Sequence, residues 1–195
     1  MVEHGTGLAS EPLDPRVRRT RALLHDSFLG LVKVKPFEEI SVQDITEAAT
    51  VNRATFYAHY RDKYALLECV AGMQFEELLQ NRGVRFDGTC PSAIRAIVLG
   101  VYDYLSTESS RVGNVDALDL HLQAAVVAVV RRMLLEGLGQ MRDWKSPVSR
   151  EMAATSTAWA LYSAVRDWYS SGNRAPAEKI VDAIYNFLLP LLKPA

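Results

Sequence analysis

Between Asn52 and Lys63 the chain carries polar side chains that can bind nucleic acid. The guanidinium fork of Arg53 can donate two parallel hydrogen bonds to O6 and N7 of one guanine base. Tyr57 and His59 can bond to bases or to phosphates, Thr55 can bond to a phosphate, and Lys63 adds a second cation. This combination indicates hydrogen bonding to a nucleic acid.

Two short helices are predicted to position these side chains. The first covers Val42 to Ala49, where Ser41 acts as N-cap and Asp44 completes a weak capping box. Thr50 and Val51 form a turn, and Asn52 caps a second helix over Arg53 to His59. Two such helices form a helix-turn-helix, whose second helix enters the major groove of DNA. On residue chemistry alone, a solvated linker helix remains the alternative.

The sequence also resembles a known family. NRATFYAHYRDKYALL is similar to the recognition-helix signature of TetR-family transcriptional regulators, and PFEEISVQDITEAATV resembles the part that precedes it. The resemblance covers roughly Arg18 to Leu67. Two positions depart from the family pattern. Thr50 replaces the usual turn glycine, which predicts backbone strain, and Ala58 replaces a larger side chain, which predicts one contact fewer.

These observations predict one face that contacts double-stranded DNA. Its residues are Ser41, Arg53, Ala54, Thr55, Tyr57, Ala58, His59 and Lys63. Two copies of the second helix, about 34 Å apart in a homodimer, would contact successive major-groove turns, so the expected operator is palindromic. We expect Arg53 to select a base, and Ser41, Thr55 and Lys63 to contact phosphates.

An amphipathic helix is predicted before this motif. It begins near Pro15 with Asp14 as N-cap and ends at Lys35 and Pro36. Its first turns hold a cluster of arginines that is either a solvated face or a phosphate contact: Arg16, Arg18, Arg19 and Arg21. From residue 16 to residue 63 there are nine Lys and Arg against six Asp and Glu, so the local charge is +3, although the whole chain carries −1.

The predicted fold is all-α, with about nine helices. Residues 1–15 are expected to form a disordered arm, 16–63 the helix-turn-helix domain, 64–81 a connecting helix and 82–195 a helical C-terminal domain for ligand binding and dimerisation. The C-terminal helices are predicted over Ser92–Thr107, Asp116 to about Trp144, Pro147–Tyr169 and Pro176–Leu192, with a loop at Ser109–Asn114.

The last two helices carry two apolar faces that can pair with those of a second copy. We expect dimer contacts from Met152, Thr155, Trp159, Ile180, Ile184, Phe187, Leu188 and Leu191; the alternative is that they complete the monomer core. The family resemblance implies an unidentified small-molecule effector. Candidate ligand contacts are Tyr102, His121, Gln123, Met133, Trp144, Trp159 and Tyr162, each of which can equally be a core residue.

Other function classes lack their sequence signals. There is no phosphate loop, nucleophile elbow or metal-ligand spacing, so we predict no enzyme activity, no metal and no cofactor. Cys69 and Cys90 are far apart in sequence, and no signal peptide or membrane span is visible, which favours a cytoplasmic protein. The expected function is a DNA-binding regulator, a repressor released by its ligand. The alternative is a helical ligand- or partner-binding protein with weakened or lost DNA binding.

Overall fold

The computed structural model describes residues 14–84, 91–111, 116–142, 144–171 and 176–192. These residues form eight α-helices and one short 3-10 helix, which confirms the all-α prediction. The chain divides into two compact units, Met1–Leu66 and Leu67–Ala195. The division falls inside α4 (Lys63–Asn81), the helix that we predicted to connect the domains. Of the predicted N-terminal arm, only Asp14 and Pro15 are among the described residues. Cys90 also lies outside them.

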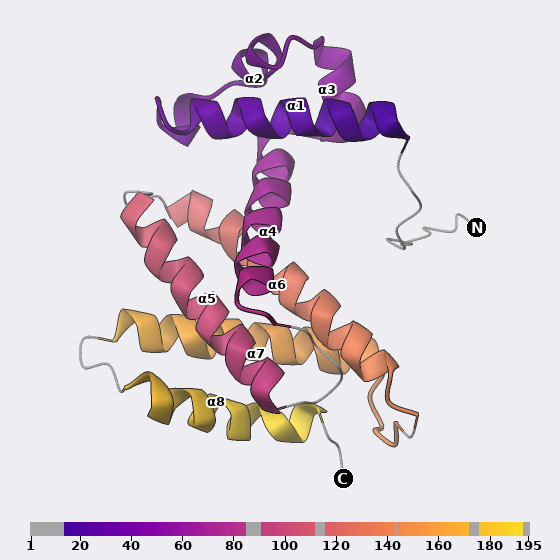
Figure 1. The fold of residues 1–195 in the computed structure, drawn as a ribbon, viewed down its shortest axis with the longest axis vertical. Helices are drawn as coiled ribbons and strands as arrows, with labels where there is room; N and C mark the ends of the chain where they lie inside the picture. The colour runs from indigo at the N-terminus through magenta and orange to yellow at the C-terminus, as the bar shows by residue number, and fades with distance from the viewer. Residues whose placement is uncertain (1–13, 85–90, 112–115, 143, 172–175, 193–195) are drawn as a thin grey trace. The chain divides into compact units, whose positions relative to one another are not determined.

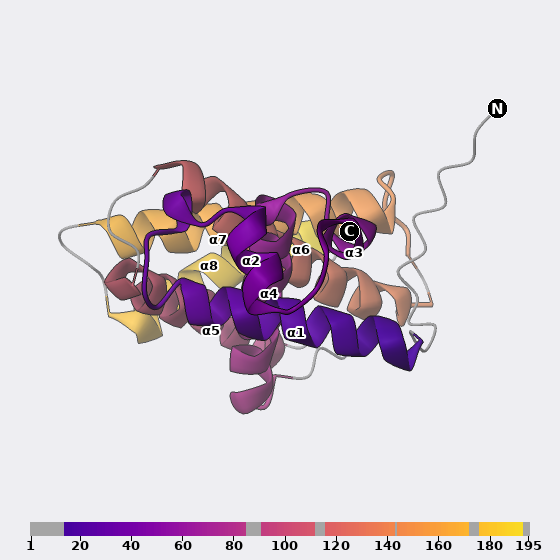
Figure 2. The same ribbon diagram turned by 90° about the horizontal axis from the view of Figure 1, so that it is seen from above.

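The first unit contains α1 (Pro15–Leu31), the 3-10 helix η1 (Phe37–Glu39), α2 (Val42–Ala48) and α3 (Arg53–His59) (Figures 1 and 2). Helix α1 begins as predicted, because Pro15 occupies the first turn and the Asp14 side chain accepts a 2.8 Å hydrogen bond from the Arg16 amide. The unit closes over a core of aromatic and aliphatic side chains: Leu24, Phe28, Phe37, Ile40, Ile45, Phe56 and Leu66.

The turn between α2 and α3 is a Schellman motif with threonine in the position that glycine usually holds. The Thr50 amide donates to the Glu47 carbonyl at 3.1 Å, and the Val51 amide donates to the Thr46 carbonyl at 3.0 Å. This pattern requires a left-handed residue at its centre, and Thr50 has φ of 55°. The expected strain at Thr50 is therefore present, and hydrogen bonds on both sides of the residue hold it in place.

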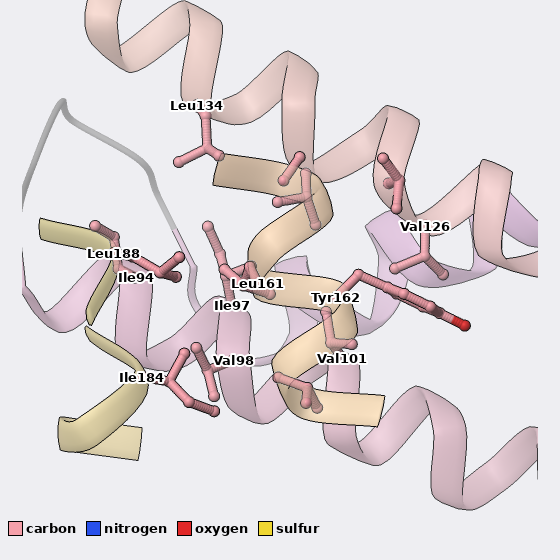
Figure 3. Packing of buried hydrophobic residues seen from close by; sticks show 14 of the residues in the cluster. Ile94, Ile97, Val98, Val101, Val126, Leu134, Leu161, Tyr162, Ile184 and Leu188 are labelled. Carbon is pink, nitrogen blue, oxygen red and sulfur yellow. The ribbon is translucent and has the colours of Figure 1, made fainter. Parts of the chain in front are cut away.

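The second unit contains most of α4, together with α5 (Pro91–Arg111), α6 (Asp116–Gly139), α7 (Arg150–Ser170) and α8 (Ala177–Leu192). Figure 3 shows how α5, α6, α7 and α8 contribute to one apolar core. Three helix ends in this unit differ from the prediction by three residues or more, and one of them is the start of α7 at Arg150 instead of Pro147. Helix α5 continues through part of the predicted loop to Arg111, and α6 ends at Gly139 instead of near Trp144. Gly139 and Gly137 lower the helix propensity of that last turn.

Contacts between polar and charged side chains connect α4, and the residue that follows it, to neighbours in this unit. Glu68 lies 2.7 Å from Nδ1 of His121 on α6, and Glu76 pairs with Arg132 on the same helix. After the helix ends, Arg82 pairs with Asp103 on α5.

Over the described ranges, no helix is long and apolar enough to span a membrane.

The strained turn gives a first prediction. Replacing Thr50 with glycine removes the left-handed penalty of a β-branched residue, about 1–2 kcal/mol, and adds roughly 0.5–1 kcal/mol of unfolded-state entropy. We therefore expect Thr50→Gly to stabilise the first unit by about 0.5–1 kcal/mol in urea unfolding followed by circular dichroism. Thr50→Ala is the matched control, since alanine keeps the left-handed penalty. A less stable glycine variant would show that the turn is not strained.

Candidate nucleic-acid interface

Helix α3 is anchored on one side and exposed on the other. Phe56 is fully buried, and Tyr60, the residue that ends the helix, is buried beside it with ring centroids 5.9 Å apart. The opposite side presents four of the predicted contact residues to solvent: Arg53, Ala54, Tyr57 and Ala58. Tyr57 is 55% exposed, although its ring packs edge-on against Phe56. A seven-residue helix with this division can enter a groove without disturbing its own anchor.

The N-caps of α2 and α3 already use two of the predicted phosphate donors. Ser41 donates its backbone amide and its hydroxyl to one carboxylate oxygen of Asp44, at 2.7 and 2.6 Å. Thr55 donates its hydroxyl to Asn52 Oδ1 at 2.9 Å, beside the capping bond from its own amide. A serine or threonine hydroxyl has a single proton to donate. Both side chains therefore order the ends of helices in this structure.

The Asp44 carboxylate joins the α2 cap to the segment before it. Lys35 lies 2.9 Å from Asp44 Oδ2, the same oxygen that accepts from Ser41. The hydrogen bonds from Ser41, followed by the bond and charge of Lys35, hold the pKa of Asp44 well below its usual value. The weak capping box predicted from sequence is thus a complete one, stabilised by a cation that sequence patterning did not identify.

A buried polar pair fixes the end of α3 to α1. His25 Nε2 lies 2.6 Å from the Tyr60 hydroxyl, and Arg21 lies 5.9 Å from the centre of the Tyr60 ring. Burial, and then the charge of Arg21, lower the pKa of His25, while Asp26 opposes them. Burial and Arg21 also lower the pKa of His59. A pKa below the usual value favours the neutral form of each imidazole, and in that form His59 can still donate or accept a hydrogen bond.

Lys63 takes a different role from the one we expected. Its ammonium donates to the backbone carbonyls of Phe37, Glu38 and Ile40 at 3.0, 3.0 and 2.8 Å, and it lies 4.6 Å from the Phe37 ring centroid. An ammonium has three N–H donors, so all of them are used. Partial burial accordingly lowers the pKa of Lys63. Lys63 fastens η1 to the first turn of α4, and its predicted hydrogen bond to phosphate lacks a donor in this arrangement.

The arginine cluster at the start of α1 divides into two groups. Arg16, Arg18 and Arg19 are exposed, so they can contact a phosphate backbone. Arg21 is half-buried, and its position over Tyr60 makes it part of the anchor of α3. Arg53 on α3 is exposed, and one of its terminal nitrogens, Nη2, donates to Oε1 of Gln43 on α2 at 3.2 Å.

Comparison with known proteins gives a family match for part of this unit. Residues 30–70 match the family described as bacterial regulatory proteins, tetR family. The matched segment contains η1, α2, α3 and the first turns of α4. It is also 36% identical over 70 residues to YxbF of Bacillus subtilis strain 168, described as an uncharacterised HTH-type transcriptional regulator. That match covers 35% of this chain and 18% of YxbF, so the chain spans much less than two thirds of this relative.

Solved TetR-family structures share the fold over nearly the whole chain. A TetR transcriptional regulator from Rhodococcus sp. RHA1 aligns with a TM-score of 0.55 at 15% identity, covering 92% of this chain and 98% of that protein. FadR of Thermus thermophilus, a TetR-family repressor solved with lauroyl-CoA, aligns with a TM-score of 0.54 at 20% identity, covering 90% and 98%. The second unit therefore has the fold of the C-terminal part of TetR-family proteins.

The seven predicted ligand contacts of the second unit lie in different settings. Tyr102 stacks on Trp168 with centroids 4.4 Å apart, and His121 pairs with Glu68. Gln123 accepts a 3.0 Å hydrogen bond from Arg166, while the Trp144 indole donates to the Val148 carbonyl at 2.8 Å. Met133 is half-buried against the core, Tyr162 is buried within it and Trp159 is exposed. Their role in binding a ligand stays a prediction.

The predicted dimer residues divide between core and surface. Ile184 and Leu188 are buried in the core of their own unit, between α8 and its neighbours, so they complete the monomer instead of facing a second copy. Thr155 and Ile180 are half-buried. Four apolar side chains remain exposed and form what we call the apolar surface of α7 and α8: Met152, Trp159, Phe187 and Leu191.

The His25–Tyr60 pair makes the first unit sensitive to acid. Because the folded pKa of His25 lies below its unfolded value near 6.5, the unfolded chain binds more protons as the pH falls through that value. Stability should therefore decrease from pH 7.5 to pH 5.5 in urea titrations. The double variant His25→Leu, Tyr60→Phe should weaken this dependence. His59→Gln should retain more of the pH dependence of stability than the double variant does, because His59 is less buried than His25. Equal slopes for wild type and the double variant would contradict the assignment to His25.

Proposed function

We propose that this chain is a sequence-specific DNA-binding transcriptional regulator that acts as a homodimeric repressor and is released by a small-molecule ligand. The observation that carries the proposal is the exposed side of α3, where Arg53, Ala54, Tyr57 and Ala58 face solvent while Phe56 and Tyr60 are buried. A helix of this kind, presented by a helix-turn-helix, docks in the major groove of DNA.

The exposed residues of α3 suit different parts of the groove. Arg53 is the proposed guanine contact, because its fork matches O6 and N7. The methyl groups of Ala54 and Ala58 can pack against thymine methyl groups, and Tyr57 can reach a base or a phosphate. The exposed arginines Arg16, Arg18 and Arg19 are proposed to bind the phosphate backbone. Ser41, Thr55 and Lys63 then act by holding the helices in place.

A homodimer is proposed through the apolar surface of α7 and α8. Phe187 is 69% exposed, Met152 57% and Trp159 42%. Met152 and Trp159 lie two turns apart on α7, and Phe187 and Leu191 lie one turn apart on α8, so each helix presents its pair on one side. Apolar side chains of this size are rarely left together in water. Symmetric pairing of this surface would present two copies of α3 to the half-sites of a palindromic operator.

A small-molecule effector is proposed by analogy with proteins of the same fold. FadR of Thermus thermophilus is a repressor whose structure contains lauroyl-CoA. In the present chain, Glu68 and Glu76 of α4 contact His121 and Arg132 of α6, and α4 begins in the first unit. A ligand that prefers one arrangement of these helices would shift the population of DNA-binding dimers.

The DNA contact is tested by selecting bound sequences from random duplex DNA, with and without a metabolite extract. We expect wild type to enrich a palindrome and to bind it less tightly at higher salt. Arg53→Ala should lose roughly 5- to 150-fold of the preference at one guanine per half-site, the value of one bidentate contact of about 1–3 kcal/mol. Arg18→Ala should weaken binding to all sequences alike.

Two outcomes would decide against parts of this proposal. An equal loss for every operator variant with Arg53→Ala would remove Arg53 as a base contact. If wild type enriches no sequence and its binding does not depend on salt, the chain is better described as a helical ligand- or partner-binding protein without DNA-binding function. Release of the enriched operator by the metabolite extract would support the effector.

The dimer surface gives a separate prediction. The double variant Trp159→Glu, Phe187→Glu should convert a dimer into a folded monomer, because two charges would be buried in the interface. Analytical ultracentrifugation measures the mass, and circular dichroism reports helix content. Leu120→Glu is the matched control, since Leu120 is 62% exposed on α6 and is not part of the proposed surface. A double variant that sediments like wild type would place the interface elsewhere.

A further inference from the structure

Three side chains from α2 and α3 form a continuous hydrogen-bonded chain on the exposed side of the helix-turn-helix. Gln43 Nε2 donates to Glu47 Oε1 at 2.8 Å, one turn further along α2. Gln43 Oε1 accepts from Arg53 Nη2 at 3.2 Å, across the turn between the helices. All three residues are exposed. Gln43 thus connects the first helix of the motif to the proposed base-contacting residue of the second.

The two partners of Gln43 determine which way its amide points. A carboxylate only accepts hydrogen bonds and a guanidinium only donates them. The amide nitrogen must therefore face Glu47 and the amide oxygen must face Arg53, since the reversed amide would lose both bonds. This removes the usual ambiguity of a glutamine side chain. Glu47 fixes the amide, and the amide fixes one edge of the guanidinium.

The contact leaves Arg53 able to recognise a base. A guanidinium has five N–H donors, and Gln43 uses one of them. A bidentate bond to guanine needs two more. An unrestrained arginine loses considerable rotamer freedom when it binds, whereas one held on a single edge has less to lose. A neighbouring phosphate is also less able to draw Arg53 away from the base when Nη2 is already bonded.

We propose that Gln43 is a specificity-determining positioning residue, which orients Arg53 for bidentate recognition of guanine while Glu47 orients Gln43. The inference rests on the proposed function as a DNA-binding regulator. Hydrogen bonds between exposed side chains contribute little to folding, so the role of this chain of bonds is in selecting the base and not in stabilising the fold.

The first test needs no DNA. Gln43→Met keeps the length of the side chain and removes both hydrogen bonds. Nitrogen-15 relaxation of the Arg53 side chain should show an ordered guanidinium in wild type and a mobile one in Gln43→Met. The melting temperature should change by no more than about 2 °C. Gln80→Met, at an exposed position of α4, is the matched control and should leave Arg53 ordered. An equally mobile Arg53 in wild type would overturn the positioning role.

The second test measures base preference in a double-mutant cycle. The measured quantity is the Kd for the operator with the proposed guanine replaced in each half-site, divided by the Kd for the selected operator. Gln43→Met should lower this ratio roughly fivefold, because an unrestrained Arg53 loses more rotamer freedom when it binds the guanine. In the Arg53→Ala background, Gln43→Met should have no further effect on the ratio.

The outcomes separate this inference from the proposed function. A wild-type chain without sequence preference overturns the proposed function and this inference with it. If wild type shows the preference and Arg53→Ala removes it, but Gln43→Met leaves the ratio unchanged, only the role of Gln43 is overturned. An equal loss with Gln43→Met in the Arg53→Ala background would make Gln43 a direct base contact, and uniformly weaker binding would make it a phosphate contact; both results contradict positioning.

Discussion

Burial of Phe56 and Tyr60 is the interaction on which the DNA-binding unit depends. A helix of seven residues is too short to be stable by its own hydrogen bonds, so α3 exists because its inner side is packed. Phe56 supplies apolar contact, and Tyr60 adds a hydrogen bond from α3 to His25 on α1. This anchor uses only two of the helix's side chains, which leaves the others available for binding.

The polar residues around α3 fall into two groups: those that bond within the motif and those that are exposed to solvent. Ser41, Asn52 and Thr55 use their side chains to cap short helices, and Lys63 bonds three carbonyls that would otherwise face solvent or the core edge. If these groups bonded to DNA instead, the hydrogen bonds that order the motif would be lost. Under the proposed function, hydrogen bonds to DNA would come from the side chains that are not needed for local structure, chiefly Arg53 and Tyr57. The role of Ser41, Thr55 and Lys63 as direct DNA contacts stays a prediction.

Local signals in the sequence predicted most of the helices, whereas contacts between residues far apart in the sequence were not predicted. The caps at Asp14, Ser41 and Asn52 depend on neighbours within four residues, so spacing was enough to find them. The strained turn at Thr50 was expected from the family resemblance, because threonine replaces the usual glycine there. The bonds of Lys63 to the η1 backbone and of His25 to Tyr60 join residues 23 to 35 positions apart, and no periodicity encodes them. Likewise, apolar spacing on α8 could not distinguish the buried Ile184 and Leu188 from the exposed Phe187.

The distribution of cations explains why a second copy matters for function. Of the positive side chains between residues 16 and 63, Lys63 is bonded to carbonyls, Lys35 to Asp44, and Arg21 lies against Tyr60. Arg61 pairs with the adjacent Asp62. The exposed arginines at the start of α1, Arg53 and the exposed Lys33 remain for the proposed DNA contact. Each phosphate contact raises the magnitude of the slope of log K against log salt concentration by about one and contributes modestly to affinity. A single first unit with this few exposed cations would therefore bind DNA weakly. In the proposed homodimer, the apolar surface of α7 and α8 would join two copies and make the second contact intramolecular, which would raise affinity without any additional charge.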